Sequence, residues 1–180
     1  QMLTIWVAIF YTDIYGLDAI HVGTMYLVVR VFDAITDPLV GFMVDRTRTR
    51  WGSSRPFILF GTIPLAISFI MVFYTPDLGP TGKLIFAYCS FSLLSLTYTF
   101  VNVPFSAMAG LLTRNSDERT PLQSYRFGLG MSASVLISAG VVASVAYFGG
   151  DDEQYGWFLT AIMFALILCA CLFYCALTVK

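Results

Sequence analysis

Two aspartates and one arginine lie inside a single apolar segment of this chain. Arg30, Asp33 and Asp37 are three and four residues apart, so on an α-helix they share one face. If residues 20–44 cross a bilayer, this face lies near mid-depth, where a charged side chain costs at least about 2.5 kcal/mol. Ionisable residues at that depth face the protein interior or a water-filled cavity, and by default they mark an ion or substrate path.

These carboxylates permit two kinds of chemistry. Their hard oxygens, with the Thr36 hydroxyl beside them, suit a hard cation, and Asp33 and Asp37 are then the metal ligands. A carboxyl group in a dry site can instead take up and release a proton. The alternative without transport is a static ion pair between Arg30 and Asp33. Such a pair leaves the negative charge of the second aspartate, Asp37, without a counter-charge. Pro38 weakens the helix directly after Asp37 and can free a backbone carbonyl as a further oxygen donor.

A second polar stripe lies in the apolar segment 84–111. Tyr98, Asn102 and Ser106 are four residues apart and share a helix face, and Thr99 is one turn from Asn102. Neutral hydrogen-bonding groups beside an aromatic ring suit a ligand with many hydroxyl groups. Hydrogen bonds between membrane helices explain the same pattern equally well.

Other charged residues lie close to the ends of apolar segments. Arg126 can donate a pair of hydrogen bonds to a substrate or carboxylate, or it can extend to the membrane interface as an anchor. Asp45 and Arg46 lie at a helix end, where they can pair with another helix end in one conformation and release it in another. Such a pair biases a two-state gate, while the arginines of 46–55 also serve as a plain topology signal.

The composition is that of an all-α integral membrane protein. Charged residues make up 12% of the chain and hydrophobic residues 58%, with a mean hydropathy of +0.78, whereas soluble domains have about 25% charged residues. The four cysteines lie in apolar segments without metal or disulfide spacing, and the single histidine, His21, is at a helix start. No catalytic Ser/His/Asp set or cluster of histidines is present, so we expect neither an enzyme nor a cofactor.

Six apolar segments are expected to form helices within one domain, 1–180. The first is too short to cross a hydrocarbon core of about 30 Å and is interpreted as the second half of a truncated helix. Turn-forming residues separate the others, and Pro104 lies inside the fourth. The predicted helices are 1–11, 20–44, 57–73, 84–111, 123–148 and 155–179.

Basic residues are concentrated in two of the connections between these helices. Four arginines lie in 45–55, and Arg114 and Arg119 lie in 113–121, whereas the connections after the first and fifth helices have no basic residue. By the positive-inside rule, both arginine-rich connections are cytoplasmic. We therefore expect a multi-pass protein of the cell (inner) membrane, and the arginines indicate topology and not a nucleic-acid partner.

Three ordered stretches resemble one family of transporters. They are DAITDP followed by GFMVDRTRTRWGSSRP, TYTFVNVPFSA at 97–107, and DERTPLQSYRF at 117–127. They are similar to stretches of the glycoside-pentoside-hexuronide:cation symporters, the melibiose permease group of the major facilitator superfamily. The resemblance covers almost the whole chain and implies the N-terminal six-helix bundle of a twelve-helix carrier. Such a carrier moves a sugar or glycoside together with Na⁺, Li⁺ or H⁺ by alternating access.

The resemblance also implies roles for individual residues. The cation-site positions of the family correspond here to Asp33, Thr36 and Asp37, with Thr99 close by. Arg126 and Asn102 fall on sugar-binding positions, beside Tyr98 and Ser106 of the same polar stripe. The basic position of the second helix and the cytoplasmic charge network correspond to Arg30, Asp45, Arg46 and Arg119.

Two positions depart from melibiose permease itself, which has an acid where this chain has Asn102 and an amide where it has Thr36. Neither galactoside specificity nor Na⁺ use is therefore carried over, and the loss of both groups favours proton coupling as a hypothesis. The expected partners are a sugar or glycoside, a monovalent cation, the lipid bilayer and the missing C-terminal half. The alternatives are a carrier of another solute, such as a lysolipid, and a non-transporting membrane scaffold whose acids are static.

Overall fold

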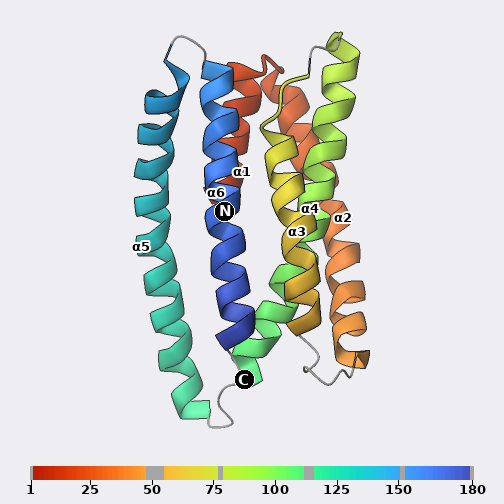
Figure 1. Cartoon of the computed structure of the whole chain (residues 1–180). Coiled ribbons are helices and arrows are strands. Elements are labelled where there is room, and N and C mark those ends of the chain that lie inside the picture. Colours follow the sequence, from red (N-terminus) through yellow and green to blue (C-terminus); the bar gives the residue numbers. More distant parts are fainter. Residues whose placement is uncertain (1, 48–54, 77–78, 112–115, 151–152, 179–180) are drawn as a thin grey trace.

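The chain folds into a bundle of long helices (Figure 1). The computed structural model describes residues 2–47, 55–76, 79–111, 116–150 and 153–178, and no strand occurs among them. The first helix, α1, passes directly into a short π-helix, η1, which ends before Gly16, a residue with a positive φ of 74°. The elements are α1 (Met2–Ile9), η1 (Phe10–Ile14), α2 (Ala19–Arg46), α3 (Arg55–Val72), α4 (Pro80–Leu111), α5 (Ser116–Gly149) and α6 (Glu153–Thr178).

Successive helices run up and down along a common direction, so α2 ends on the same side of the bundle where α5 begins (Figure 1). The most extensive packing joins α3 with α4 and with α6. α5 packs chiefly on α6 at one flank, and α2 packs chiefly on α4 at the other. The two flanking helices are therefore each held by one central helix.

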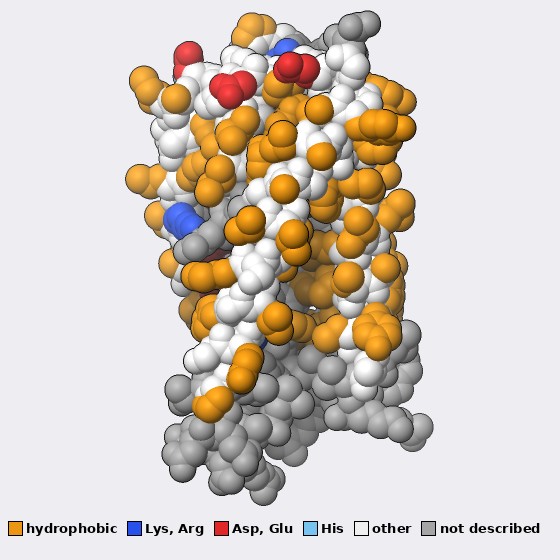
Figure 2. All heavy atoms as spheres, turned by 90° about the vertical axis from the view of Figure 1, so that its left-hand side faces the viewer, with side chains coloured by type: hydrophobic (Ala, Val, Ile, Leu, Met, Phe, Trp, Pro, Cys, Tyr) orange, Lys and Arg blue, Asp and Glu red, His pale blue; other side chains and the backbone are white. Residues whose placement is uncertain are grey.

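The surface of the bundle is suited to lipid. Three of the described helices are long and apolar enough to cross a membrane, over Pro80–Ala107, Ser124–Gly149 and Glu153–Ala176. α2 has 28 residues, which also suffices in length, but it carries the charged side chains discussed above. Hydrophobic side chains cover the flank formed by α5 (Figure 2), where Leu136 is 73% exposed. A bilayer covers such a surface, so the predicted all-α integral membrane class is confirmed.

The core combines an aromatic cluster with hydrogen bonds between helices. The Phe73 ring stacks on Trp157 with centroids 5.9 Å apart, and it meets Phe10 edge-on at 5.1 Å. Ser68 of α3 and Thr97 of α4 share a buried hydrogen bond of 2.8 Å. Interhelical hydrogen bonds of this kind contribute about 0.6–2 kcal/mol each in membranes. Together these contacts fix α3, α4, α6 and η1 relative to one another.

Two helices begin at least four residues earlier than the sequence predicted. α4 begins at Pro80 and not near 84, and α5 begins at Ser116 and not near 123. Proline is tolerated in the first turn because the N–H that it lacks has no partner there. Residues 113–121, predicted as a loop, therefore include the first turn of α5.

Helices α5 and α6 approach each other most closely at a pair of glycines. A Cβ added to Gly156 would lie 2.5 Å from the Gly149 Cα and 2.9 Å from the Val145 carbonyl oxygen. Both contacts are with backbone atoms of α5, which cannot move aside as a flexible side chain can. Gly156 is therefore required by the approach of the two helices.

We expect Gly156→Ala to lower the free energy of unfolding by about 1–3 kcal/mol, because the added methyl group overpacks this contact. Thermal unfolding of the purified complete gene product in detergent measures the change. Gly128→Ala on α5 is the matched control, since a Cβ there has nothing within 4 Å. Equal unfolding temperatures for the two variants would show that the helices do not approach at Gly156 as described.

Candidate functional site

Two parallel hydrogen bonds join the aspartates of α2 to hydroxyl groups of α4. Ser95 Oγ donates to Asp33 Oδ1 at 2.6 Å, and Thr99 Oγ1 donates to Asp37 Oδ1 at 2.9 Å. The two acceptors are four residues apart on one helix and the two donors are four residues apart on the other, so each pair forms one rung of a ladder. We refer to these four residues as the carboxylate ladder.

In the ladder, each carboxylate of α2 accepts a hydrogen bond from a hydroxyl group of α4. Hydrogen bonds to a carboxylate are shorter and roughly twice as strong as those between neutral groups. Asp33 is half-buried and Asp37 is exposed when this chain is taken by itself. The carboxylates therefore keep free oxygen lone pairs on a surface of the bundle that a cation or proton can reach.

Ser95 was missed by the sequence analysis, although Asp33, Asp37 and Thr99 were all predicted for the cation site. A signal for it was present in the spacing. Two carboxylates one turn apart on α2 require donors one turn apart on the neighbouring helix, and Ser95 lies four residues before Thr99. The resemblance did not point to it either, because the similar stretch begins at 97.

Thr36 and Arg30 lie apart from the ladder's hydrogen bonds. The Thr36 side chain is buried, and its hydroxyl donates to the Asp33 backbone carbonyl of its own helix at 3.4 Å. Arg30 is exposed and, within the described part of the chain, forms no ion pair with either aspartate. No group of three or more His, Cys, Asp or Glu side chains that could hold a metal ion occurs among the described residues. A cation at the ladder would depend on hydroxyl oxygens as well as carboxylates.

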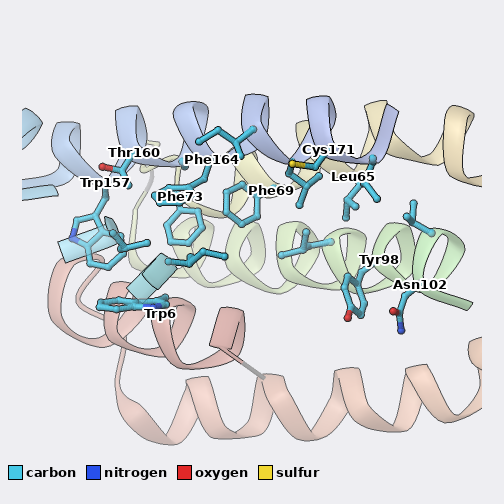
Figure 3. Close-up of a pocket in the computed structure, with 18 of the residues that line it drawn as sticks. Trp6, Leu65, Phe69, Phe73, Tyr98, Asn102, Trp157, Thr160, Phe164 and Cys171 are labelled. Atoms are coloured by element: carbon cyan, nitrogen blue, oxygen red, sulfur yellow. The ribbon is translucent and has the colours of Figure 1, made fainter. Parts of the chain in front are cut away.

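A cavity of about 490 Å³ lies between the central helices and α5. In Figure 3, aromatic residues gather near Trp6 and Trp157 at one end, while Tyr98 and Asn102 project side by side from α4 at the other. The lining is mostly apolar. The buried Thr160 hydroxyl, which also borders the cavity, has no hydrogen-bond partner among the described atoms. The cavity thus offers an apolar wall with a few polar groups to a bound molecule.

Arg126 of α5 contacts Phe105, one of the residues that line this cavity. Its guanidinium carbon lies 5.0 Å from the centre of the Phe105 ring, and Phe105 lines the cavity one turn from Asn102. A guanidinium over an aromatic face gains about 0.5–2 kcal/mol and keeps its N–H groups free to donate. Ser106, predicted with this group, is exposed. The structure therefore places Tyr98 and Asn102 at one end of the cavity, and Arg126 beside Phe105, which lines the same cavity.

The predicted charge network is placed only in part. Asp45 and Arg46 are both exposed at the end of α2, and the Arg46 guanidinium lies 4.5 Å from the centre of the Phe42 ring. Asp45 makes no ion pair within the described residues. The side chain of Arg119 and most of the connection 45–55 lie outside the described residues.

Comparison with known proteins decides the family. A protein-family model described as "MFS/sugar transport protein" matches residues 1–180. The chain belongs to this family. Its helices, its apolar surface and its cavity are then those of the N-terminal part of a major facilitator superfamily transporter. The family predicted from the three sequence stretches is thereby confirmed.

Several bacterial members of the family are similar over nearly the whole chain. The putative glycoside/cation symporter YagG of Escherichia coli is 48% identical over 96% of this chain. The inner membrane symporter YicJ of the same organism is 40% identical over 98% of the chain. The isoprimeverose transporter of Lactiplantibacillus pentosus is 36% identical over 93% of it. The chain spans 38% of the length of the first two relatives and 35% of the third.

The hydrogen bond between Thr99 and Asp37 predicts a measurable coupling between the two side chains. Thr99→Val and Asp37→Asn should each destabilise the complete gene product, but the double variant should lose about 1–2 kcal/mol less than the sum, because the charge-assisted bond is removed only once. Denaturant unfolding in detergent measures the cycle. A second cycle of Thr99→Val with the distant Asp18→Asn should be additive, and additivity in both cycles would contradict the contact.

Proposed function

We propose that the complete gene product is a secondary active transporter that moves a sugar or glycoside together with H⁺ or Na⁺ by alternating access. The observation that carries this proposal is the carboxylate ladder, whose donor helix α4 also lines the cavity. Two carboxylates with hydroxyl partners provide oxygens for a coupling ion. The names of similar proteins, a glycoside/cation symporter and an isoprimeverose transporter, support the same class of function.

In this proposal the sugar binds at the polar end of the cavity. Asn102 and Arg126 donate hydrogen bonds to its hydroxyl groups, and the Tyr98 and Phe105 rings can cover an apolar sugar face. Thr99 lies next to Tyr98 in the chain and one turn from Asn102, so the ion site and the sugar site share one helical turn of α4. A rigid helix that contacts both ligands couples their binding.

The energetic coupling follows from linkage. An ion or proton at Asp33 and Asp37 neutralises charge that otherwise disfavours closure of the cavity, so ion and sugar each strengthen the binding of the other. The two effects are equal by thermodynamic necessity and commonly amount to about 1–3 kcal/mol. Movement of this bundle against the C-terminal half then exposes the loaded site to the other side of the membrane. No organic cofactor or enzymatic step enters this cycle.

The orientation in the membrane follows from the basic residues. We propose a multi-pass protein of the inner membrane in which the arginine-rich connections 45–55 and 113–121 face the cytoplasm. The acidic residues Asp13, Asp18 and Glu153, which are exposed at the opposite end of the bundle, then face outward. Acidic side chains gather at that end in Figure 2.

A second candidate solute is an amphipathic molecule such as a lysolipid. The mostly apolar lining of the cavity, including Phe69, Phe73 and Phe164, favours it. Tyr98, Asn102 and Arg126 at the other end would then meet its polar head. A membrane scaffold with static acids predicts instead that changes at Asp33 and Asp37 alter stability and not ion dependence.

The decisive test adds glycosides, pentosides, hexuronides and a lysolipid one at a time to de-energised, lightly buffered cells that express the complete gene product. We expect one sugar to produce an alkaline or Na⁺-depleting transient in the medium, because the ion enters with it. Asp37→Asn should abolish the transient, whereas Asp18→Asn, an equal change at an exposed connection, should preserve it. Silence for every sugar, with the folded protein present in the membrane, would refute sugar symport.

Arg126 offers a test of the proposed sugar site. Arg126→Lys should raise the half-saturating sugar concentration about tenfold, because Lys keeps the charge but loses the planar pair of donors. Phe105→Leu should raise it by a smaller factor, since the guanidinium loses the ring that positions it. Radiolabelled uptake at saturating ion concentration measures both. Phe60→Leu, at a ring that is 73% exposed, is the matched control and should leave uptake unchanged; an unaffected Arg126→Lys would exclude the residue from the site.

A further inference from the structure

Of the four residues of the carboxylate ladder, Ser95 alone was not predicted for the ion site, either from the residue pattern or from the family resemblance. Its hydroxyl is half-buried between α2 and α4 and donates to Asp33 at 2.6 Å, the shorter of the two rungs. A serine hydroxyl has one proton and two lone pairs. Because the proton is directed to Asp33, both lone pairs of Ser95 Oγ remain available to another partner.

An ion of the size of Na⁺ can be reached from both rungs when their side chains turn toward it. Side chains four residues apart on a helix are separated along its axis by about 6 Å, at roughly 1.5 Å per residue. An ion midway between the rungs would therefore lie about 3 Å from each level, somewhat beyond the roughly 2.3–2.6 Å at which oxygens bind Ca²⁺. Na⁺ and Ca²⁺ have nearly the same radius, so carboxylate and hydroxyl oxygens of both rungs would move toward the ion on binding it.

The neighbouring Thr36 does not compete for this role. Its hydroxyl proton is directed to a carbonyl oxygen of its own helix, and its side chain is buried against the bundle. Melibiose permease has an amide at the position of Thr36, and its absence here favours proton coupling on the sequence alone. The Ser95 hydroxyl oxygen of α4 compensates for this missing oxygen. A proton needs only one carboxylate, whereas four oxygens from two helices match the coordination of a hard metal cation.

We propose that Ser95 supplies an oxygen of the cation site and thereby makes Na⁺ a coupling ion of the complete transporter. The proposal rests on the proposed symport function and deepens it by naming the ion and a residue that selects it. Ser95 has two roles at the site. It holds Asp33 in place through the hydrogen bond, and it offers a neutral oxygen to Na⁺.

The test measures uptake of the transported sugar by the complete transporter as a function of Na⁺ concentration at constant pH. Ser95→Ala should raise the half-activating Na⁺ concentration roughly tenfold, as expected when a metal site loses a supporting group. Ser95→Thr retains the hydroxyl and should stay close to the wild type. The half-saturating sugar concentration, measured at saturating Na⁺, should be unchanged in both variants, which a merely structural defect would not achieve.

Two further variants keep the test decisive. Ser92→Ala makes the same change three residues earlier on α4, at a half-buried serine outside the ladder, and should match the wild type. Ser95→Cys replaces the oxygen by a softer sulfur of similar size, so it should also raise the half-activating Na⁺ concentration if Ser95→Ala fails to reach the membrane. Protein in the membrane is quantified by immunoblotting for every variant.

The outcomes separate this inference from the function on which it rests. Unchanged Na⁺ dependence in Ser95→Ala, together with its loss in Asp37→Asn, would remove Ser95 from the site. Sugar uptake that moves protons and is indifferent to Na⁺ would overturn the choice of ion but leave symport intact. Uptake without dependence on any cation would instead refute the proposed symport function itself.

Discussion

The placement of two carboxylates inside an apolar helix is the constraint on which the rest of this structure depends. In the hydrocarbon region no bulk water solvates a charge, so the protein itself must supply the partners. α4 provides them as two hydroxyl groups at the spacing of the acids, 2.6 Å and 2.9 Å away. This requirement fixes α2 against α4 in both position and register, because sliding either helix by one residue would separate both pairs.

Contacts with the other central helices position α4 beside the carboxylates of α2. α3 packs against α4 and α6, and the buried bond between Ser68 and Thr97 links α3 to α4. The aromatic rings of Phe73 and Trp157 tie the same helices together. α5 approaches α6 most closely at Gly149 and Gly156, and most of its surface is left uncovered by the other described helices.

The sequence predicted the helical class, the family and much of the grouping of polar residues. Composition suffices for the helical class, since apolar segments in a membrane leave few alternatives to helices. The family, and the grouping of Thr99 with the two aspartates, followed from the resemblance of three sequence stretches. The early start of α5 at Ser116 was not predicted, because a polar stretch that contains a proline is typical of a loop. The same residue types also occur in the first turns of a helix, and the sequence alone does not distinguish the two. Ser95 was missed because serine is common in membrane helices, and only the position of α2 distinguishes it from its neighbours. Arg30 shows the reverse case: spacing alone permitted an ion pair that the exposed side chain does not make within the described residues.

Three consecutive residues of α4 each face a different part of the molecule. Thr97 bonds to the core at Ser68, Tyr98 projects into the cavity, and Thr99 bonds to Asp37. Successive side chains on a helix are about 100° apart, so the three side chains point in three directions, and each one makes a contact there. Rotation of α4 as a rigid body would therefore disturb all three contacts at once. The core, the cavity wall and the carboxylates are thus mechanically linked through one turn of this helix.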